Sequence, residues 1–341
     1  MAGLGSGSGT ESLRARLAQG GVALILNRHA KRVRTGRLDP GQLRGLVELH
    51  GQSFEPASLE ELAGIAHEVR ARDPGLIAIC GGDGTYQKTL TALLHAYGGH
   101  PLPVLLPLAG GTFNVLTTAL GTGGNPVKVL TRAMATIRSP GRGGAAGHFA
   151  RMTTLPILQV SEEEGRLKTQ WGFLFATGVI SRIIARYTEG PSSTARAARV
   201  FSEAVGGFMM QTPSAKELTR RHAAVIDVDG ERFEHGGILG FLAGTIQAHV
   251  LGFTPFVNRK RLRNSFNFAI GALDASEAIG LLPALVRGRA WSTHPGLKNA
   301  TARELRLETD EGFILDGDVY PSGVSRRLTL SVGPRLRFLR P

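Results

Sequence analysis

Residues 76–85 read LIAICGGDGT, and this stretch decides the fold. Its first five residues are apolar and partly β-branched, a run long enough for a buried strand and too short for a helix. Glycines around Asp83 follow, and glycine lets the backbone turn tightly and approach a bulky anion closely. Residues 86–97 carry apolar residues at helical spacing, with Thr85 placed to cap the first turn. A strand, a glycine turn and a helix start together predict a phosphate-binding loop.

Asp83 is the unusual residue of this turn. A carboxylate beside bound phosphates repels them unless a divalent cation lies between, or unless the carboxylate takes a proton from the attacking group. The sequence leaves both roles open. A plain strand-to-helix turn is the alternative, because glycine-rich turns with one aspartate are common.

A second glycine turn of the same form favours the functional interpretation. Residues 104–108 are another short apolar run, and AGGTFN at 109–114 follows before a helix-like segment. If the two strands are adjacent and parallel, both turns lie at the carboxyl edge of one sheet, where open α/β folds bind ligands. The residues predicted to bind phosphates are Gly81, Gly82, Asp83, Gly84, Thr85, Gly110, Gly111, Thr112 and Asn114.

These motifs, GGDGT at 81–85 and Pro107 followed by GTFN at 111–114, resemble the catalytic domain of the diacylglycerol kinase and sphingosine/ceramide kinase superfamily. The sequence DGD at 316–318 resembles that family's C-terminal acidic element, so the likeness extends over most of the chain. The resemblance implies an ATP-dependent lipid kinase that uses Mg²⁺ or another divalent cation. Its acceptor is a hydroxyl of ceramide, a sphingoid base or diacylglycerol.

The resemblance also implies two catalytic residues, Asp83 and Asp318. It gives Asp318 the role of taking the proton from the lipid hydroxyl. A hairpin turn is the alternative for residues 316–318, since Asp-Gly is a common turn pair.

Asn27 and Arg28 follow the first predicted strand, 22–26. The family usually has Asn-Pro and a glycine turn here, and uses them to hold nucleotide phosphates. This chain keeps Asn27 and has Arg28 in place of the proline. We predict that both bind the nucleotide, with Lys31 and Arg32 either adding positive charge or remaining solvated.

Other departures reduce the number of carboxylates available to a metal. Val115 stands where bacterial-type diacylglycerol kinases have an aspartate, and a basic run at 259–263 replaces an acidic element. WGF at 171–173, with Arg182, Arg186 and Arg196 beyond it, is similar to the segment of sphingosine and ceramide kinases that reaches the nucleotide. Its acidic residues are missing. The departures favour a sphingoid or ceramide acceptor over diacylglycerol.

Two domains are predicted from the order of elements. The sequence indicates βα units up to a glycine-rich linker at 139–147 and mainly strands after it. We predict an α/β nucleotide-binding domain at 1–147, with a parallel sheet and flanking helices like those of NAD kinases and diacylglycerol kinases, completed by 322–341. A mainly antiparallel β-sandwich at 148–321 would bind the lipid substrate.

The charge balance favours anionic partners. The chain of 341 residues has a net charge of +13 and a single cysteine, Cys80. Aromatic residues make up 6% of it and do not alternate with the basic clusters, so no nucleic acid is expected. Residues 250–257, followed by basic residues at 259–261, have the composition of an element that inserts into an anionic membrane surface, or of a buried strand before a solvated loop. With no secretory signal evident and one cysteine, we expect a cytoplasmic protein peripheral at the membrane.

Two alternative functions remain. NAD kinases also carry GGDGT, but the chain lacks their second Asn-Glu nucleotide element, and GTFN and DGD fit lipid kinases better. The second alternative is a catalytically degenerate, basic membrane-binding module, which the missing carboxylates favour.

Overall fold

The computed structural model describes residues 20–138, 151–188, 199, 212–247, 254–257, 262–286 and 294–341. The chain divides into two compact units, one of Met1–Leu155 with Arg335–Pro341 and the other of Pro156–Pro334. The predicted linker at 139–147 and the basic run at 259–261 lie outside the described residues. No helix in the described part of the chain is long and apolar enough to cross a bilayer.

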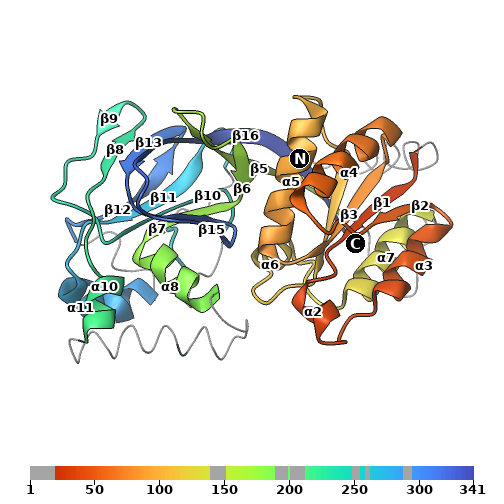
Figure 1. The fold of residues 1–341 in the computed structure, drawn as a ribbon, viewed down its shortest axis with the longest axis horizontal. Helices are drawn as coiled ribbons and strands as arrows, with labels where there is room; N and C mark the ends of the chain where they lie inside the picture. Colours follow the sequence, from red (N-terminus) through yellow and green to blue (C-terminus); the bar gives the residue numbers. More distant parts are fainter. Residues whose placement is uncertain are drawn as a thin grey trace, which may run out of the picture. The chain divides into compact units, whose positions relative to one another are not determined.

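The first unit is built on a parallel sheet with the strand order β2-β1-β3-β4, extended by the end of β16 (Figure 1). The four core strands pair in parallel, as the sequence predicts. Every residue of β1, β3 and β4 is buried, which explains their continuous apolar runs. The strands are β1 (Val22–Leu26), β2 (Gly51–Phe54), β3 (Leu76–Gly81), β4 (Val104–Ala109) and β16 (Arg326–Arg340).

Helices cover both faces of this sheet (Figure 1). One face packs against α3 and α7 through a core that includes Leu43 and Leu130, while α4 and α5 lie on the other. Helix α4 begins directly after Ser58, whose hydroxyl accepts a hydrogen bond from the Glu61 N–H at 3.1 Å. The helices are α2 (Lys31–Arg34), α3 (Pro40–Glu48), α4 (Leu59–Arg72), α5 (Asp83–Tyr97), α6 (Val115–Leu120) and α7 (Pro126–Arg138).

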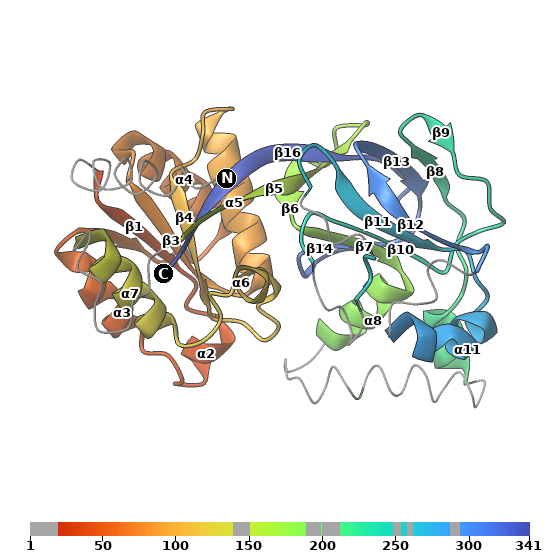
Figure 2. The same ribbon diagram turned by 180° about the vertical axis from the view of Figure 1, so that it is seen from behind.

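The second unit holds two antiparallel sheets, which confirms the predicted fold class. One has the strand order β12-β11-β10-β7-β14-β15, and Figure 2 shows β7 between β10 and β14. The other contains β13, β8 and β9 with the first part of β16, and β5 pairs with β16 and β6. The strands are β5 (Arg151–Glu162), β6 (Gln170–Gly172), β7 (Leu174–Gly178), β8 (Val225–Val228), β9 (Glu231–Arg232), β10 (Gly240–Gly244), β11 (Phe266–Gly271), β12 (Leu297–Ala302), β13 (Glu304–Thr309), β14 (Phe313–Leu315) and β15 (Asp318–Tyr320).

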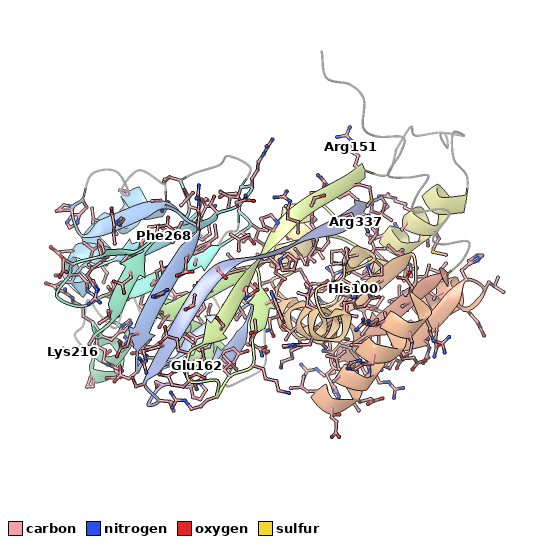
Figure 3. The ribbon with its side chains drawn as sticks, turned by 90° about the horizontal axis from the view of Figure 1, so that it is seen from above. His100, Arg151, Glu162, Lys216, Phe268 and Arg337 are labelled. Atoms are coloured by element: carbon pink, nitrogen blue, oxygen red, sulfur yellow. The ribbon has the colours of Figure 1, made fainter. Side chains whose placement is uncertain are left out.

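The core between these sheets is rich in phenylalanine. Phe175, Phe268 and Phe313 are fully buried, and Phe268 lies among the strands in Figure 3. The rings of Phe175 and Phe313 stack at 5.1 Å, and those of Phe313 and Tyr320 at 4.2 Å. Stacking of this kind adds about 0.5–1.5 kcal/mol per pair to the burial energy. Three helices complete the described part of this unit: α8 (Val179–Thr188), α10 (Pro213–Leu218) and α11 (Ala275–Val286).

Candidate functional site

The two glycine turns touch each other at the carboxyl edge of the first unit's sheet. Gly81 pairs with Ala109 at the ends of β3 and β4, and the Gly110 N–H donates to the Gly81 carbonyl at 2.7 Å. A Cβ atom added at Gly111 would lie 2.5 Å from the Cα of Gly82. Only a glycine fits at that separation, so the two motifs form one continuous backbone surface.

Helix α5 begins inside the first motif. Gly82, in extended conformation, is the N-cap, and Asp83 is the first helical residue. The prediction that Thr85 caps the helix is wrong, because the helix starts two residues before it. The Thr85 hydroxyl instead accepts a hydrogen bond from the Asn27 Nδ2 at 2.8 Å. The N–H groups of the first turn of α5, which includes Gly84, have no partner within the helix. They lie at the positive end of the helix.

Asp83 joins the two motifs. Its Oδ1 accepts hydrogen bonds from the N–H of Val115 at 2.8 Å and of Leu116 at 3.4 Å. These residues start α6, whose own N-cap, Asn114, makes no side-chain cap bond. Burial raises the pKa of Asp83 to about 6, although the N–H groups of Leu116 and Val115 oppose the shift. A carboxylate with a pKa near neutrality is suited to proton transfer.

Asn114 shapes its own turn. It is buried, with a left-handed backbone at φ 51°. Its Oδ1 accepts from the Gly111 N–H at 2.9 Å, and its Nδ2 donates to the Gly111 carbonyl at 3.0 Å. Thr112 is half-buried and Phe113 is 46% exposed, so these two residues form the outer part of the turn.

Asn27 and Arg28 lie at the same edge, after β1. The Asn27 N–H donates to the Cys80 carbonyl at 3.0 Å, which holds this loop against the first glycine motif. Arg28 pairs with Glu55, and Arg44 donates to the other Glu55 oxygen at 2.8 Å. The Glu55 side chain is 10% exposed and that of Arg28 is 66% exposed. Arg28 is thus anchored by an acid whose side chain is largely buried.

Sequence reasoning missed Glu55. It follows β2, a strand of sequence GQSF that has no apolar run to reveal it. Had this strand been recognised, Glu55 would have stood at the carboxyl edge of a parallel sheet, which is the expected place for functional side chains.

In the second unit, residues 315–318 form a two-residue hairpin. Leu315 pairs with Asp318, and Asp316 and Gly317 both have positive φ, at 48° and 94°, as a type I′ turn requires. Asp316 is the anchor of this turn. Its carboxylate accepts from the N–H of Phe173 at 2.7 Å and of Leu174 at 2.8 Å.

Asp318 starts β15 and is half-buried. Burial, followed by the negative charge of Asp318, raises the pKa of Tyr320 to about 12, so that the phenol stays neutral. The motif therefore contains both a hairpin turn and a second acid. Asp316 anchors the turn, and Asp318 follows it at the start of β15.

Arg182, on α8, pairs with Glu311. This buried pair could not be predicted, because the two residues are 129 positions apart and no local pattern connects them. Arg196 lies outside the described residues.

Few side chains among the described residues could hold a metal. No cluster of three His, Cys, Asp or Glu side chains occurs in the described parts of the chain. A protein-made metal cage therefore does not fit there. Mg²⁺ in nucleotide sites usually takes one or two carboxylates and completes its shell with phosphates and water, and Asp83 fits that smaller role.

The comparisons with known proteins agree with this geometry. Residues 21–144 match the family model described as the diacylglycerol kinase catalytic domain. No curated protein sequence matches the chain significantly.

Solved structures share the fold over nearly the whole chain. A diacylglycerol kinase from Bacillus anthracis str. Sterne superposes with a TM-score of 0.61 at 13% identity, covering 94% of this chain and 97% of that one. A candidate diacylglycerol kinase from the same strain gives 0.63 at 14% identity with the same coverage. At such identities the likeness shows a common fold. Together with the family match, it confirms the predicted resemblance: the segment 21–144 is similar to a diacylglycerol kinase catalytic domain.

Proposed function

We propose that this protein is an ATP-dependent lipid kinase, which transfers the γ-phosphoryl group of ATP to a hydroxyl group of a lipid. The observation that carries the proposal is the contact between the two glycine turns, with Asp83 bridging them at the start of α5. The N-terminus of α5 lies there, and a helix N-terminus favours a polyphosphate. The match of residues 21–144 to a diacylglycerol kinase catalytic domain supports the kinase assignment.

The reaction needs the phosphates held, their charge neutralised and a hydroxyl deprotonated in line. Residues 81–85 and 110–112 would hold the phosphates, with Asn27 and Arg28 beside them. The lipid oxygen forms a bond to the γ-phosphorus while the bond from that phosphorus to the β,γ-bridging oxygen breaks, and ADP leaves. We propose that Asp318 is the general base that takes the proton from the lipid hydroxyl.

Asp83 has one of two roles in this scheme. As a ligand it would hold Mg²⁺, or another divalent cation, together with the nucleotide phosphates, and the cation would neutralise charge on the transferring group. As a base it would take a proton itself, which its raised pKa favours.

The acceptor that we propose is ceramide or a sphingoid base, with diacylglycerol as the alternative. Val115 supports this choice, because an apolar residue follows the GT-x-N motif in sphingosine kinases. A lipid acceptor also requires access to a membrane, and the net charge of +13 favours an anionic surface. We therefore propose peripheral membrane association of a cytoplasmic protein.

One experiment tests the function and separates it from its rivals. The protein is incubated with γ-labelled ATP and either NAD or vesicles containing diacylglycerol, ceramide and a sphingoid base, and products are identified by mass. We expect label in a phosphorylated lipid. Label in NADP would establish a NAD kinase, and the absence of transfer to every acceptor, with vesicle binding retained, would establish a non-catalytic module.

A further inference from the structure

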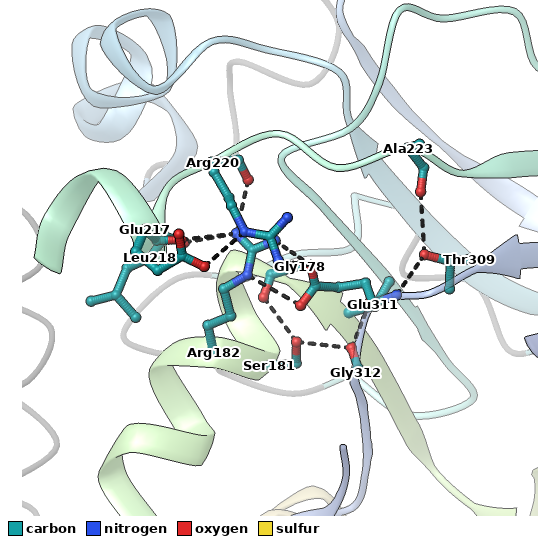
Figure 4. A network of polar contacts seen from close by, with 11 residues as sticks. Gly178, Ser181, Arg182, Glu217, Leu218, Arg220, Ala223, Thr309, Glu311 and Gly312 are labelled. Carbon is teal, nitrogen blue, oxygen red and sulfur yellow. Dashed lines mark hydrogen bonds and ion pairs between the residues drawn. The ribbon is translucent and has the colours of Figure 1, made fainter. Parts of the chain in front are cut away.

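Arg182 lies at the centre of a polar network in the second unit (Figure 4). Its Nε donates to Glu311 Oε1 at 3.2 Å, and its Nη2 pairs with the other carboxylate oxygen. Its Nη1 donates to backbone carbonyls of α10 and the residues after it, namely those of Glu217 at 3.4 Å, Leu218 at 3.1 Å and Arg220 at 2.8 Å. All three guanidinium nitrogens of Arg182 are therefore engaged inside the unit.

Glu311 is the acid that this network neutralises. Its side chain is 4% exposed and that of Arg182 is 11% exposed, so the pair is largely removed from water. Arg220 adds a second contact to the Glu311 carboxylate at 3.1 Å. Burial alone would raise the pKa of Glu311, but the hydrogen bond and charge of Arg182 hold that pKa below its ordinary value. The carboxylate is thus ionised and bound to two arginines.

The network fixes the start of β14. Gly312, next to Glu311, has a carbonyl oxygen that accepts from the Thr177 hydroxyl at 2.8 Å and from the Ser181 hydroxyl at 3.1 Å. Figure 4 shows Ser181, Arg182 and Gly312 around this point. Strand β14 begins at the following residue, so the residue that leads into it is held by β7 and α8.

The far end of β14 is held by a separate set of contacts. There Asp316 binds two N–H groups before and within β7. At the start of β14 the Tyr320 ring stacks on Phe313. Asp318 lies between these two anchors in the sequence and the hairpin. Its position therefore depends on where β14 starts as well as on the turn itself.

We propose that Arg182 is a positioning residue for Asp318: by binding Glu311 it sets the start of β14 and so the place of the acid-bearing hairpin. The functional part of this inference rests on the proposed kinase activity. It departs from the resemblance to sphingosine and ceramide kinases, in which the corresponding segment reaches the nucleotide. Here the guanidinium is occupied by Glu311 and three carbonyls, so nucleotide binding does not depend on it.

The test uses Arg182→Lys in the full chain. Lysine keeps the positive charge beside Glu311 but lacks the planar fork that binds both carboxylate oxygens and the α10 carbonyls. The matched control is Arg306→Lys, which alters an exposed Arg–Glu pair on β13 in the same unit. Hydrogen exchange of amides 313–320, kcat, the KM for ATP and the Kd of an ATP analogue are measured for each protein.

Loss of one buried hydrogen bond corresponds to roughly tenfold in an equilibrium. For Arg182→Lys we expect about tenfold faster exchange at 313–320 and about tenfold lower kcat, while the KM and Kd for nucleotide stay within about twofold. Arg306→Lys should match wild type in all four measurements. If Arg182→Lys does not fold, the double variant Thr177→Val with Ser181→Ala removes the hydroxyl bonds to Gly312 and should produce the same pattern.

Two results would overturn the inference. Weaker nucleotide binding with unchanged kcat would make Arg182 a nucleotide ligand, and unchanged exchange at 313–320 would show that it does not set the hairpin. Failure of the proposed function is distinguishable, because an inactive wild-type protein refutes the kinase activity while the exchange measurement still decides whether Arg182 holds β14.

Discussion

The motif around Asp83 and the DGD motif at 316–318 differ in how structural and proposed chemical roles are distributed among their aspartates. In the first unit one residue, Asp83, bridges two backbone turns and is also the residue proposed for chemistry. In the second unit Asp316 anchors the hairpin, and Asp318 two positions later is the proposed base. The role of a carboxylate in such a motif therefore depends on its hydrogen bonds, and neighbouring aspartates are not interchangeable.

The largest expected effect comes from separating the two aspartates of the hairpin. Asp318→Asn should lower kcat by about 10² to 10⁴, the usual contribution of a general base, with little change in stability. In Asp316→Asn the new residue tolerates the left-handed turn. One of the two carboxylate oxygens that accept N–H groups becomes an NH₂ group, which can only donate. This change should cost about 1–3 kcal/mol of stability. We measure kcat and thermal unfolding for both variants. Lower kcat in Asp316→Asn with lower stability in Asp318→Asn would reverse the roles of the two aspartates.

The stability of the first unit should depend on pH through Asp83. Its pKa is raised from 3.8 to about 6 by burial, so the folded chain holds this proton more tightly than the unfolded chain does. The resulting stabilisation is complete below the unfolded value and is lost as the pH rises through 6. Asp83→Asn removes that loss.

We therefore expect Asp83→Asn and wild type to be similarly stable near pH 4, and the variant to be more stable by up to ~3 kcal/mol at pH 7. Denaturant unfolding of both proteins across this range measures the difference. A difference that does not change with pH would show that Asp83 has an ordinary pKa.

The contact between the glycine turns yields a smaller effect. In Gly111→Ala the new Cβ would meet the Cα of Gly82 at 2.5 Å, and we expect a loss of about 1–3 kcal/mol in stability together with weaker nucleotide binding. Gly64→Ala on α4 is the control, because nothing lies within 4 Å of its Cβ. Alanine at that helix position should stabilise the protein by about 0.5–1 kcal/mol. Equal stability and equal nucleotide binding of the two variants would show that the contact between Gly82 and Gly111 is unimportant.

Local patterns predicted the first unit better than the second. The runs before GGDGT and GGTFN are strands because both are continuous and apolar, and their parallel order follows from the helix between them. In contrast, β12 reads LKNATA and has little apolar signal, while β15 is only three residues long. Residues 232–241 contain only the end of β9 and the start of β10.

The long-range polar contacts could not be predicted from the sequence. The bonds from Val115 and Leu116 to Asp83 span 32 and 33 positions, and they exist only because two turns pack together. The wrong prediction of a cap at Thr85 has the same origin, because the Thr85 hydroxyl accepts a hydrogen bond from Asn27 in the loop after β1. Motif spacing predicted that the two glycine turns lie side by side, and packing decided which hydrogen bonds their residues make.

The most direct measurement is a nucleotide footprint on both glycine turns. Hydrogen exchange of the amides at 81–86 and 110–115 is followed in the full chain with and without a non-hydrolysable ATP analogue and Mg²⁺. Because the two turns form one backbone surface, we expect slower exchange in both segments at the same nucleotide concentration. Saturating nucleotide that protects only one turn, or neither, would contradict it.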